Sequence, residues 1–123
     1  MKLMIVDDHP GARDTIRELL TAPGVIICEC ACGEDAVTLA DIFEPDWVTM
    51  DVRMGGLDGF KATGILRKAH PETRVVIVTN DDGPQVRKAA LAAGAVGYVP
   101  KERFDELREL ILCETTSTRN GGK

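Results

Sequence analysis

Four short apolar runs in this sequence end in side chains that are capable of chemistry. These side chains are three acids, one hydroxyl and one ammonium: Asp7, Asp8, Asp51, Thr79 and Lys101. A buried strand seldom ends in a carboxylate for packing reasons, because removing a charge from water is costly unless something compensates it. We therefore expect the five side chains to form one site that holds a divalent cation and a phosphoryl group.

The acids define the kind of metal and the kind of reaction. Crowded carboxylates repel one another, and one of them would take up a proton unless a cation lay among them. Mg²⁺ suits such a site because it prefers oxygen ligands and keeps several waters, whereas zinc favours His or Cys. A carboxylate beside a metal and Lys101 can act as nucleophile in phosphoryl transfer, because both cations neutralise charge on the phosphoryl oxygens. Asp51 is the expected acceptor.

Strands and helices must alternate along the chain to bring these residues together. Apolar runs of strand length cover 3–6, 25–32, 47–50, 75–78 and 96–100. A period near 3.6 predicts helices over about 10–22, 33–43 and 58–69, another around 86–93 that Gly94 closes, and a fifth after Lys101. Gly64 lies in the middle of the third predicted helix, over 58–69, and lowers its helix propensity. The alternation predicts an α/β fold with a doubly wound parallel sheet, in which ligands bind at the carboxyl ends of the strands.

Length and charge narrow the class of protein. The 123 residues, 44% of them hydrophobic, suffice for one domain with one core, which we place at 1–114, followed by a polar tail or linker at 115–123. The net charge of −5 argues against non-specific nucleic-acid binding. The apolar runs are far shorter than the ~20 residues of a membrane span. Met1 leads straight into a core strand, so we expect a cytoplasmic protein without a signal peptide.

Three cysteines alternate in one strand-like run and would share one face: Cys28, Cys30 and Cys32. Their spacing is tighter than that of most metal sites, so we expect them to pack beneath a helix, as we do for Cys113. His9 is expected to pack in its loop, and His70 to mark a helix terminus.

Four sequence blocks together resemble the receiver domain of the two-component response regulators. They are Val6-Asp7-Asp8-His9, Met50-Asp51-Val52-Arg53-Met54 with Leu57-Asp58-Gly59 after it, Val78-Thr79, and Gly97-Tyr98-Val99-Pro100-Lys101. The resemblance runs from about Lys2 to Leu112. The Asp-Asp-His-Pro motif with Arg13 after it, and the Gly-Tyr-Val-Pro-Lys ending, are most similar to the branch typified by nitrate-response regulators. Most members of that branch carry a C-terminal helix-turn-helix.

This resemblance implies a flavodoxin-like fold, with five helices around a five-stranded parallel sheet of order 2-1-3-4-5. It implies that Asp51 accepts a phosphoryl group from a phosphohistidine on a sensor histidine kinase or a histidine phosphotransfer protein. Asp8 and Asp51 would ligate Mg²⁺ directly, together with the main-chain carbonyl of Arg53. Asp7 would act through water.

The resemblance also implies a switch. Lys101 would contact the phosphoryl oxygens, Thr79 would swing its hydroxyl toward them, and Tyr98 would move inward behind it. The surface of the fourth helix, fifth strand and fifth helix would change as a result. The resemblance allows a homodimer without requiring one. We expect no direct contact of this domain with nucleic acid or membrane.

The sequence departs from the family pattern around the site. Gly55 stands where the family usually has proline, and Gly56 comes next, which would make the loop more flexible. Asn80 stands where a small residue is usual. We expect Arg53 and Asp81 to form an ion pair across the mouth of the site, and expect these side chains to slow loss of the phosphoryl group.

Other functions fit the sequence less well. A dehalogenase-type phosphatase needs an acid two residues after its nucleophile, where this chain has Arg53, so we expect a signalling module and not a turnover enzyme. A flavodoxin-like FMN binder needs a phosphate loop after the first strand, where the acidic pair Asp7-Asp8 would repel a phosphate. We expect the chain to be the receiver domain of a DNA-binding transcription factor. The alternative is a stand-alone receiver, or a pseudo-receiver that acts only by protein contact.

Overall fold

The computed structural model describes residues 1–54, 56–80 and 83–113, which form alternating strands and helices. The strands are β1 (Lys2–Val6), β2 (Ile26–Cys30), β3 (Trp47–Asp51), β4 (Arg74–Thr79) and β5 (Gly97–Pro100). The α-helices are α1 (Pro10–Leu20), α2 (Gly33–Phe43), α3 (Gly59–Ala69), α4 (Pro84–Ala92) and α5 (Phe104–Arg108). The tail expected at 115–123 lies outside the described residues.

The strands form one five-stranded parallel sheet of order β2-β1-β3-β4-β5. This confirms the expected doubly wound, flavodoxin-like fold. Because every neighbouring pair is parallel, the carboxyl ends of all the strands lie along one edge of the sheet. Val6 pairs with Met50 and Asp51 pairs with Val78, so the chain leaves β1, β3 and β4 at neighbouring points of that edge.

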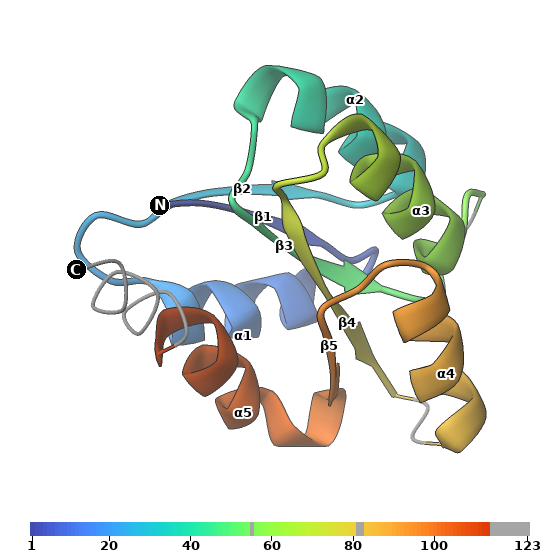
Figure 1. The fold of residues 1–123 in the computed structure, drawn as a ribbon. Helices are drawn as coiled ribbons and strands as arrows, with labels where there is room; N and C mark the ends of the chain where they lie inside the picture. Colours follow the sequence, from blue (N-terminus) through green and yellow to red (C-terminus); the bar gives the residue numbers. More distant parts are fainter. Residues whose placement is uncertain (55, 81–82, 114–123) are drawn as a thin grey trace, which may run out of the picture.

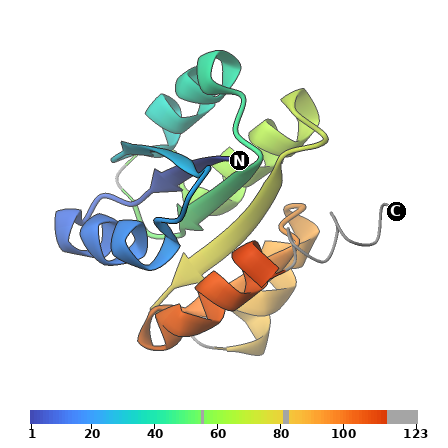
Figure 2. The same cartoon turned by 90° about the vertical axis from the view of Figure 1, so that its left-hand side faces the viewer.

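Helices cover both faces of the sheet (Figures 1 and 2). Alternate residues along each strand point to opposite faces. Val48 and Met50 belong to the core beneath α2, α3 and α4, whereas Trp47 belongs to the core beneath α1 and α5. Apolar layers thus pack on both faces of the sheet, and the side chains at its carboxyl edge project from between them.

Several helix boundaries differ from the predicted ones, including those of α1 and of the segment after Pro100. α1 ends at Leu20, two residues early. Thr21 adopts extended backbone (ψ 124°) and its hydroxyl donates to Arg17 O, while Pro23 disfavours a helical conformation at Ala22. The segment after Pro100 begins as a 3-10 turn (Lys101–Arg103), continues as α5 and ends as a π-helical turn (Glu109–Cys113). Leu107 and Ile111 of this segment are buried in the core beneath α1 and α5.

The half-buried side chains of Cys28 and Cys30 pack against the core beneath α2, which confirms the structural interpretation of these two thiols. Cys32 is the residue before the first turn of α2, and nothing is described of the side chain of Cys113. His70 caps the end of α3, as predicted, and its Nε2 also lies 2.8 Å from Asp41 Oδ1 of α2.

Within the described ranges, no helix combines the length and the apolar character that crossing a membrane requires.

Candidate functional site

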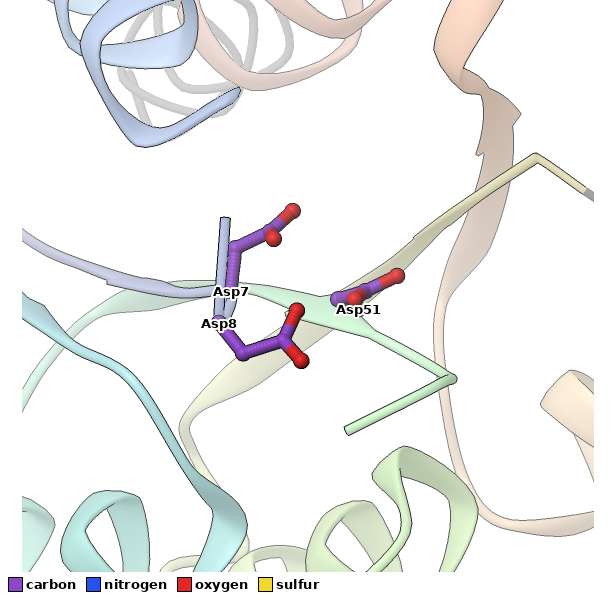
Figure 3. A group of neighbouring side chains, drawn as sticks. All are labelled: Asp7, Asp8 and Asp51. Atoms are coloured by element: carbon purple, nitrogen blue, oxygen red, sulfur yellow. The ribbon is translucent and has the colours of Figure 1, made fainter. Parts of the chain in front are cut away.

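The acids at the ends of β1 and β3 come together, as the sequence predicted. One carboxylate oxygen from each of Asp7, Asp8 and Asp51 lies within 4.8 Å of the others. Figure 3 shows the three side chains grouped where the two neighbouring strands end. Asp7 is fully buried and Asp51 is 5% exposed, whereas Asp8 is exposed. The cluster therefore has a closed base and an open side.

Lys101 supplies the positive charge expected at this cluster. Its Nζ lies 2.9 Å from Asp7 Oδ2 and 3.4 Å from Asp51 Oδ1. The ammonium is therefore closer to the buried acid than to the expected phosphoryl acceptor. One ammonium beside three carboxylates leaves the group with a net negative charge.

The pKa values of the site reflect this imbalance. Burial, reinforced by the negative charge of Asp7, raises the pKa of Asp51 to about 6 even though Lys101 opposes the shift. Burial alone would lower the pKa of Lys101, but its hydrogen bond to Asp7 and the charge of Asp51 outweigh burial and raise it. Lys101 therefore stays charged, and the acids favour a further cation.

The loop after Asp51 is held by close backbone contacts. The Gly59 N–H donates to Val52 O at 3.1 Å, and a Cβ on Gly59 would lie 2.1 Å from the carbonyl oxygen of Asp51. Glu34 of α2 accepts a hydrogen bond from the Leu57 N–H at 3.0 Å. Gly56 lies beside Glu34 with φ +81°, a conformation that other residues rarely adopt. The start of α3 is thereby placed directly against the end of β3.

A cleft of about 400 Å³ opens above the acids. Its lining includes most of the residues predicted for the site: Asp8, Asp51, Arg53, Thr79, Asn80 and Lys101. Arg53 and Asn80 are exposed at this cleft, whereas Thr79 is 1% exposed. Gly55 and Asp81 lie outside the described residues, so the expected ion pair between Arg53 and Asp81 stays a prediction.

Thr79 and Tyr98 lie on the same face of the sheet, on adjacent strands. Thr79 continues the alternation of Val75 and Ile77, which face the core beneath α3 and α4. Tyr98 pairs with Ile77 and packs against the same core. The Arg87 guanidinium of α4 lies 5.7 Å from the centre of the Tyr98 ring. The two expected switch residues thus lie on one face of adjacent strands, two positions apart in the register, and the ring of Tyr98 also faces Arg87 of α4.

All the residues that line this cleft fall within the range of one known sequence family. A family model described as the response regulator receiver domain matches residues 3–112. The chain belongs to this family.

Relatives of the receiver include regulators of the predicted branch. The response regulator GacA of Pseudomonas aeruginosa is 37% identical over 103 residues, which cover 82% of this chain and 48% of that protein. The nitrate/nitrite response regulator NarP of Escherichia coli K12 is 33% identical over 108 residues, covering 86% of this chain and 50% of NarP. The chain spans about half the length of the curated relatives it matches.

A solved structure shows the same fold. The signal receiver domain of a putative response regulator NarL from Mycobacterium tuberculosis superposes with a TM-score of 0.82 at 30% identity. The match covers 90% of this chain and 92% of that domain.

Two contacts of the receiver were not predicted from its sequence. His9 caps α1, since its Nδ1 accepts from the Ala12 N–H at 3.3 Å. Arg13 donates from Nη1 to the main-chain carbonyl of Asp7 at 2.6 Å. Proline at the first position of α1 indicated the helix start, but no pattern indicated that an arginine one turn later would reach back to the acidic pair.

The acidic group of the receiver fits a divalent cation. Its donors are carboxylate oxygens, its side facing the cleft is open, and burial with mutual repulsion opposes the charge of Asp51 in the absence of a cation. Among the described residues, no second group of His, Cys, Asp or Glu side chains offers a comparable cluster of ligand atoms.

Proposed function

We propose that this receiver accepts a phosphoryl group on Asp51 from a phosphohistidine of a sensor histidine kinase or phosphotransfer protein. The observation that carries the proposal is the position of Asp51: it ends β3 in an open cleft, between two further acids and the Lys101 ammonium. The proposed place of action is the cytoplasm.

In the proposed reaction, a carboxylate oxygen of Asp51 forms a bond to phosphorus while the bond from phosphorus to the donor imidazole nitrogen breaks. The nitrogen keeps the electron pair. Lys101 can contact the transferred oxygens because its ammonium already lies 3.4 Å from Asp51 Oδ1. Asp8, Asp51 and the main-chain carbonyl of Arg53 would hold Mg²⁺, which supplies positive charge to the phosphoryl oxygens when bound.

Asp7 is assigned an indirect role toward the metal. Its Oδ1 accepts from the His9 N–H at 2.9 Å, and its Oδ2 meets Lys101. Oδ1 thus has a backbone donor and Oδ2 an ion-pair partner, which supports contact with the metal through water. Arg53 and Asn80 line the cleft and are proposed, with Asp81, to slow hydrolysis of the phosphoryl group.

The phosphoryl group is proposed to act on the rest of the domain through Thr79 and Tyr98. Movement of the Thr79 hydroxyl toward the phosphoryl oxygens would free space for Tyr98 on the same face of the sheet. Because Arg87 lies over the Tyr98 ring, α4 would register that movement. The output is proposed to be a DNA-binding domain, as in regulators of this branch, with a stand-alone receiver as the alternative.

Intact-mass spectrometry tests the proposal. The chain is incubated with Mg²⁺ and a small donor, acetyl phosphate or phosphoramidate, beside an Asp51→Asn variant and a sample with excess EDTA. We expect one adduct of ~80 Da in the wild type and none in either control. An adduct that persists in Asp51→Asn would move the acceptor elsewhere. No adduct from either donor or from a set of histidine kinases would favour the pseudo-receiver.

A further inference from the structure

An arginine of α1 holds the backbone that carries the acidic pair. Besides its hydrogen bond to the Asp7 carbonyl at 2.6 Å, Arg13 lies with its Nε 3.1 Å from Glu29 Oε1 of β2. The side chains of Arg13 and Glu29 are 20% and 24% exposed. The guanidinium is therefore held between a partly buried carboxylate and one backbone oxygen, which suits its fixed, planar array of donors.

Arg17 provides a natural comparison on the same helix. One turn after Arg13, its Nε lies 2.5 Å from the other oxygen of Glu29, Oε2. The two arginines thus share one acid and carry the same charge. They differ in that Arg13 also binds the Asp7 carbonyl.

The Asp7 carbonyl belongs to the peptide that joins the two acids. That peptide is planar, so the direction of its carbonyl also fixes the N–H of Asp8 and the path of the chain into Asp8. Asp8 lies in a bend beyond the end of β1 and is exposed. Asp7 itself is held independently, since its N–H donates to Cys30 O at 3.1 Å and its carboxylate meets His9 and Lys101.

We propose that Arg13 is a positioning residue for the divalent cation: it orients the peptide between Asp7 and Asp8 and so aims the Asp8 carboxylate at the metal. This inference rests on the proposed function, since it assigns Asp8 as a metal ligand. Groups that orient metal ligands typically change metal affinity about 10- to 100-fold when they are lost.

The charge of Arg13 and its positioning role predict opposite effects of its removal on the affinity for Mg²⁺. Arg13 carries a positive charge near three carboxylates, so its removal would by itself strengthen cation binding. If the main role of Arg13 is to position the peptide, its removal weakens binding in spite of the gained negative potential. The sign of the change therefore separates the two roles.

Calorimetric titration of the whole chain with Mg²⁺ tests the proposal in the wild type, Arg13→Gln, Arg13→Lys and the matched control Arg17→Gln. We expect the dissociation constant to rise about 10-fold in Arg13→Gln and to change less than about 2-fold in Arg17→Gln. Arg13→Lys keeps the charge but lacks the fork that holds Glu29 and the carbonyl together, so we expect it to bind about 3- to 10-fold more weakly than the wild type.

Thermal unfolding of the same four proteins in EDTA separates positioning from stability. We expect all four proteins to be folded at the temperature of the titration, with Arg13→Gln unfolding at a somewhat lower temperature than Arg17→Gln because it also loses the hydrogen bond to the Asp7 carbonyl. Equal or tighter Mg²⁺ binding by Arg13→Gln, or full binding by Arg13→Lys, would overturn the inference and leave the metal site intact. A wild type that binds no Mg²⁺ would instead remove the proposed metal site itself.

Discussion

At the scale of single residues, Asp51 stands in surroundings that oppose its charge. It is 5% exposed, and its pKa is raised to about 6 by burial first and by Asp7 second. A residue kept for stability alone would not be a carboxylate here, because an amide of the same shape avoids the cost. The raised pKa is consistent with a group that gains partners when a cation or a phosphoryl group arrives.

Asp51→Asn should therefore stabilise the receiver when no divalent cation is present. We expect the free energy of unfolding in EDTA to rise by about 1–3 kcal/mol, since the raised pKa corresponds to that range. Urea unfolding at pH 7.5 measures the change. Mg²⁺ should stabilise the wild type more than the variant, because the variant has lost a ligand. A variant that is less stable than the wild type in EDTA would contradict this account.

The pH dependence of Cys30 alkylation tests whether this thiol is buried. Burial, with smaller contributions from Cys28 and Asp35, raises the pKa of the Cys30 thiol to about 12. Iodoacetamide reacts with the thiolate, and at pH 8 roughly one Cys30 thiol in ten thousand would be ionised. We expect alkylation of the folded protein to be slow at pH 8 and to keep accelerating to the highest pH at which the chain stays folded, whereas alkylation in denaturant should level off above ~9.

Peptide mapping by mass spectrometry resolves Cys30 from its neighbours in that experiment. Equal labelling rates for folded and unfolded chains at pH 8 would show that the thiol is not held in the core.

The residue types of the site could be predicted from sequence, but some of their contacts could not. Apolar runs ending in acids located Asp7, Asp8 and Asp51, because hydrophobic patterning marks where strands end. The closer approach of Lys101 to Asp7 than to Asp51 depends on side-chain conformations, which no pattern records. The reach of Arg13 to a backbone carbonyl is equally hidden, since any residue type can supply that oxygen.

At the scale of elements, α3 shows two glycines with opposite roles. A Cβ on Gly59 would lie 2.1 Å from the Asp51 carbonyl oxygen, so the helix could not start where it does. A Cβ on Gly64, within the same helix, meets nothing within 4 Å. The first glycine is required by a close approach of backbone to backbone, whereas the second only reduces helix propensity.

Gly59→Ala should therefore destabilise the receiver by at least ~3 kcal/mol, through displacement of α3 from the end of β3. Gly64→Ala, the control on the same helix, should stabilise it by about 0.5–1 kcal/mol. Chemical denaturation monitored by circular dichroism measures both. Similar losses in the two variants would mean that the contact at Gly59 can relax.

The elements themselves could be predicted from the sequence more closely than their ends. α2 has the predicted bounds, Gly33–Phe43, and α3 begins one residue after the predicted start because Asp58 caps it through the Lys61 N–H. The 3-10 and π-helical turns around α5 were not predicted. Core spacing fixes which residues face inward, but it does not distinguish hydrogen-bond patterns that keep the same residues buried.

At the scale of the whole molecule, the site depends on the sheet more than on any loop. Asp7, Asp51 and Lys101 are far apart in the sequence and stand at the ends of three different strands, β1, β3 and β5. Strand-helix alternation was enough to predict their meeting, because parallel strands end at one edge. The sheet accounts for the site, and the chain spans about half the length of the curated relatives that it matches.

The place of Lys101 after β5 couples the acids to local opening of the sheet. β5 has four residues and is an edge strand, and such strands open more easily than central ones. Each opening of β5 takes the Lys101 ammonium away from Asp7 and Asp51. The acids then repel one another more strongly, which raises the free energy of the open form. A bound cation relieves that repulsion and thus favours the open form. Backbone amides of β5 should therefore exchange with deuterium faster when Mg²⁺ is present, against the usual protective effect of a ligand.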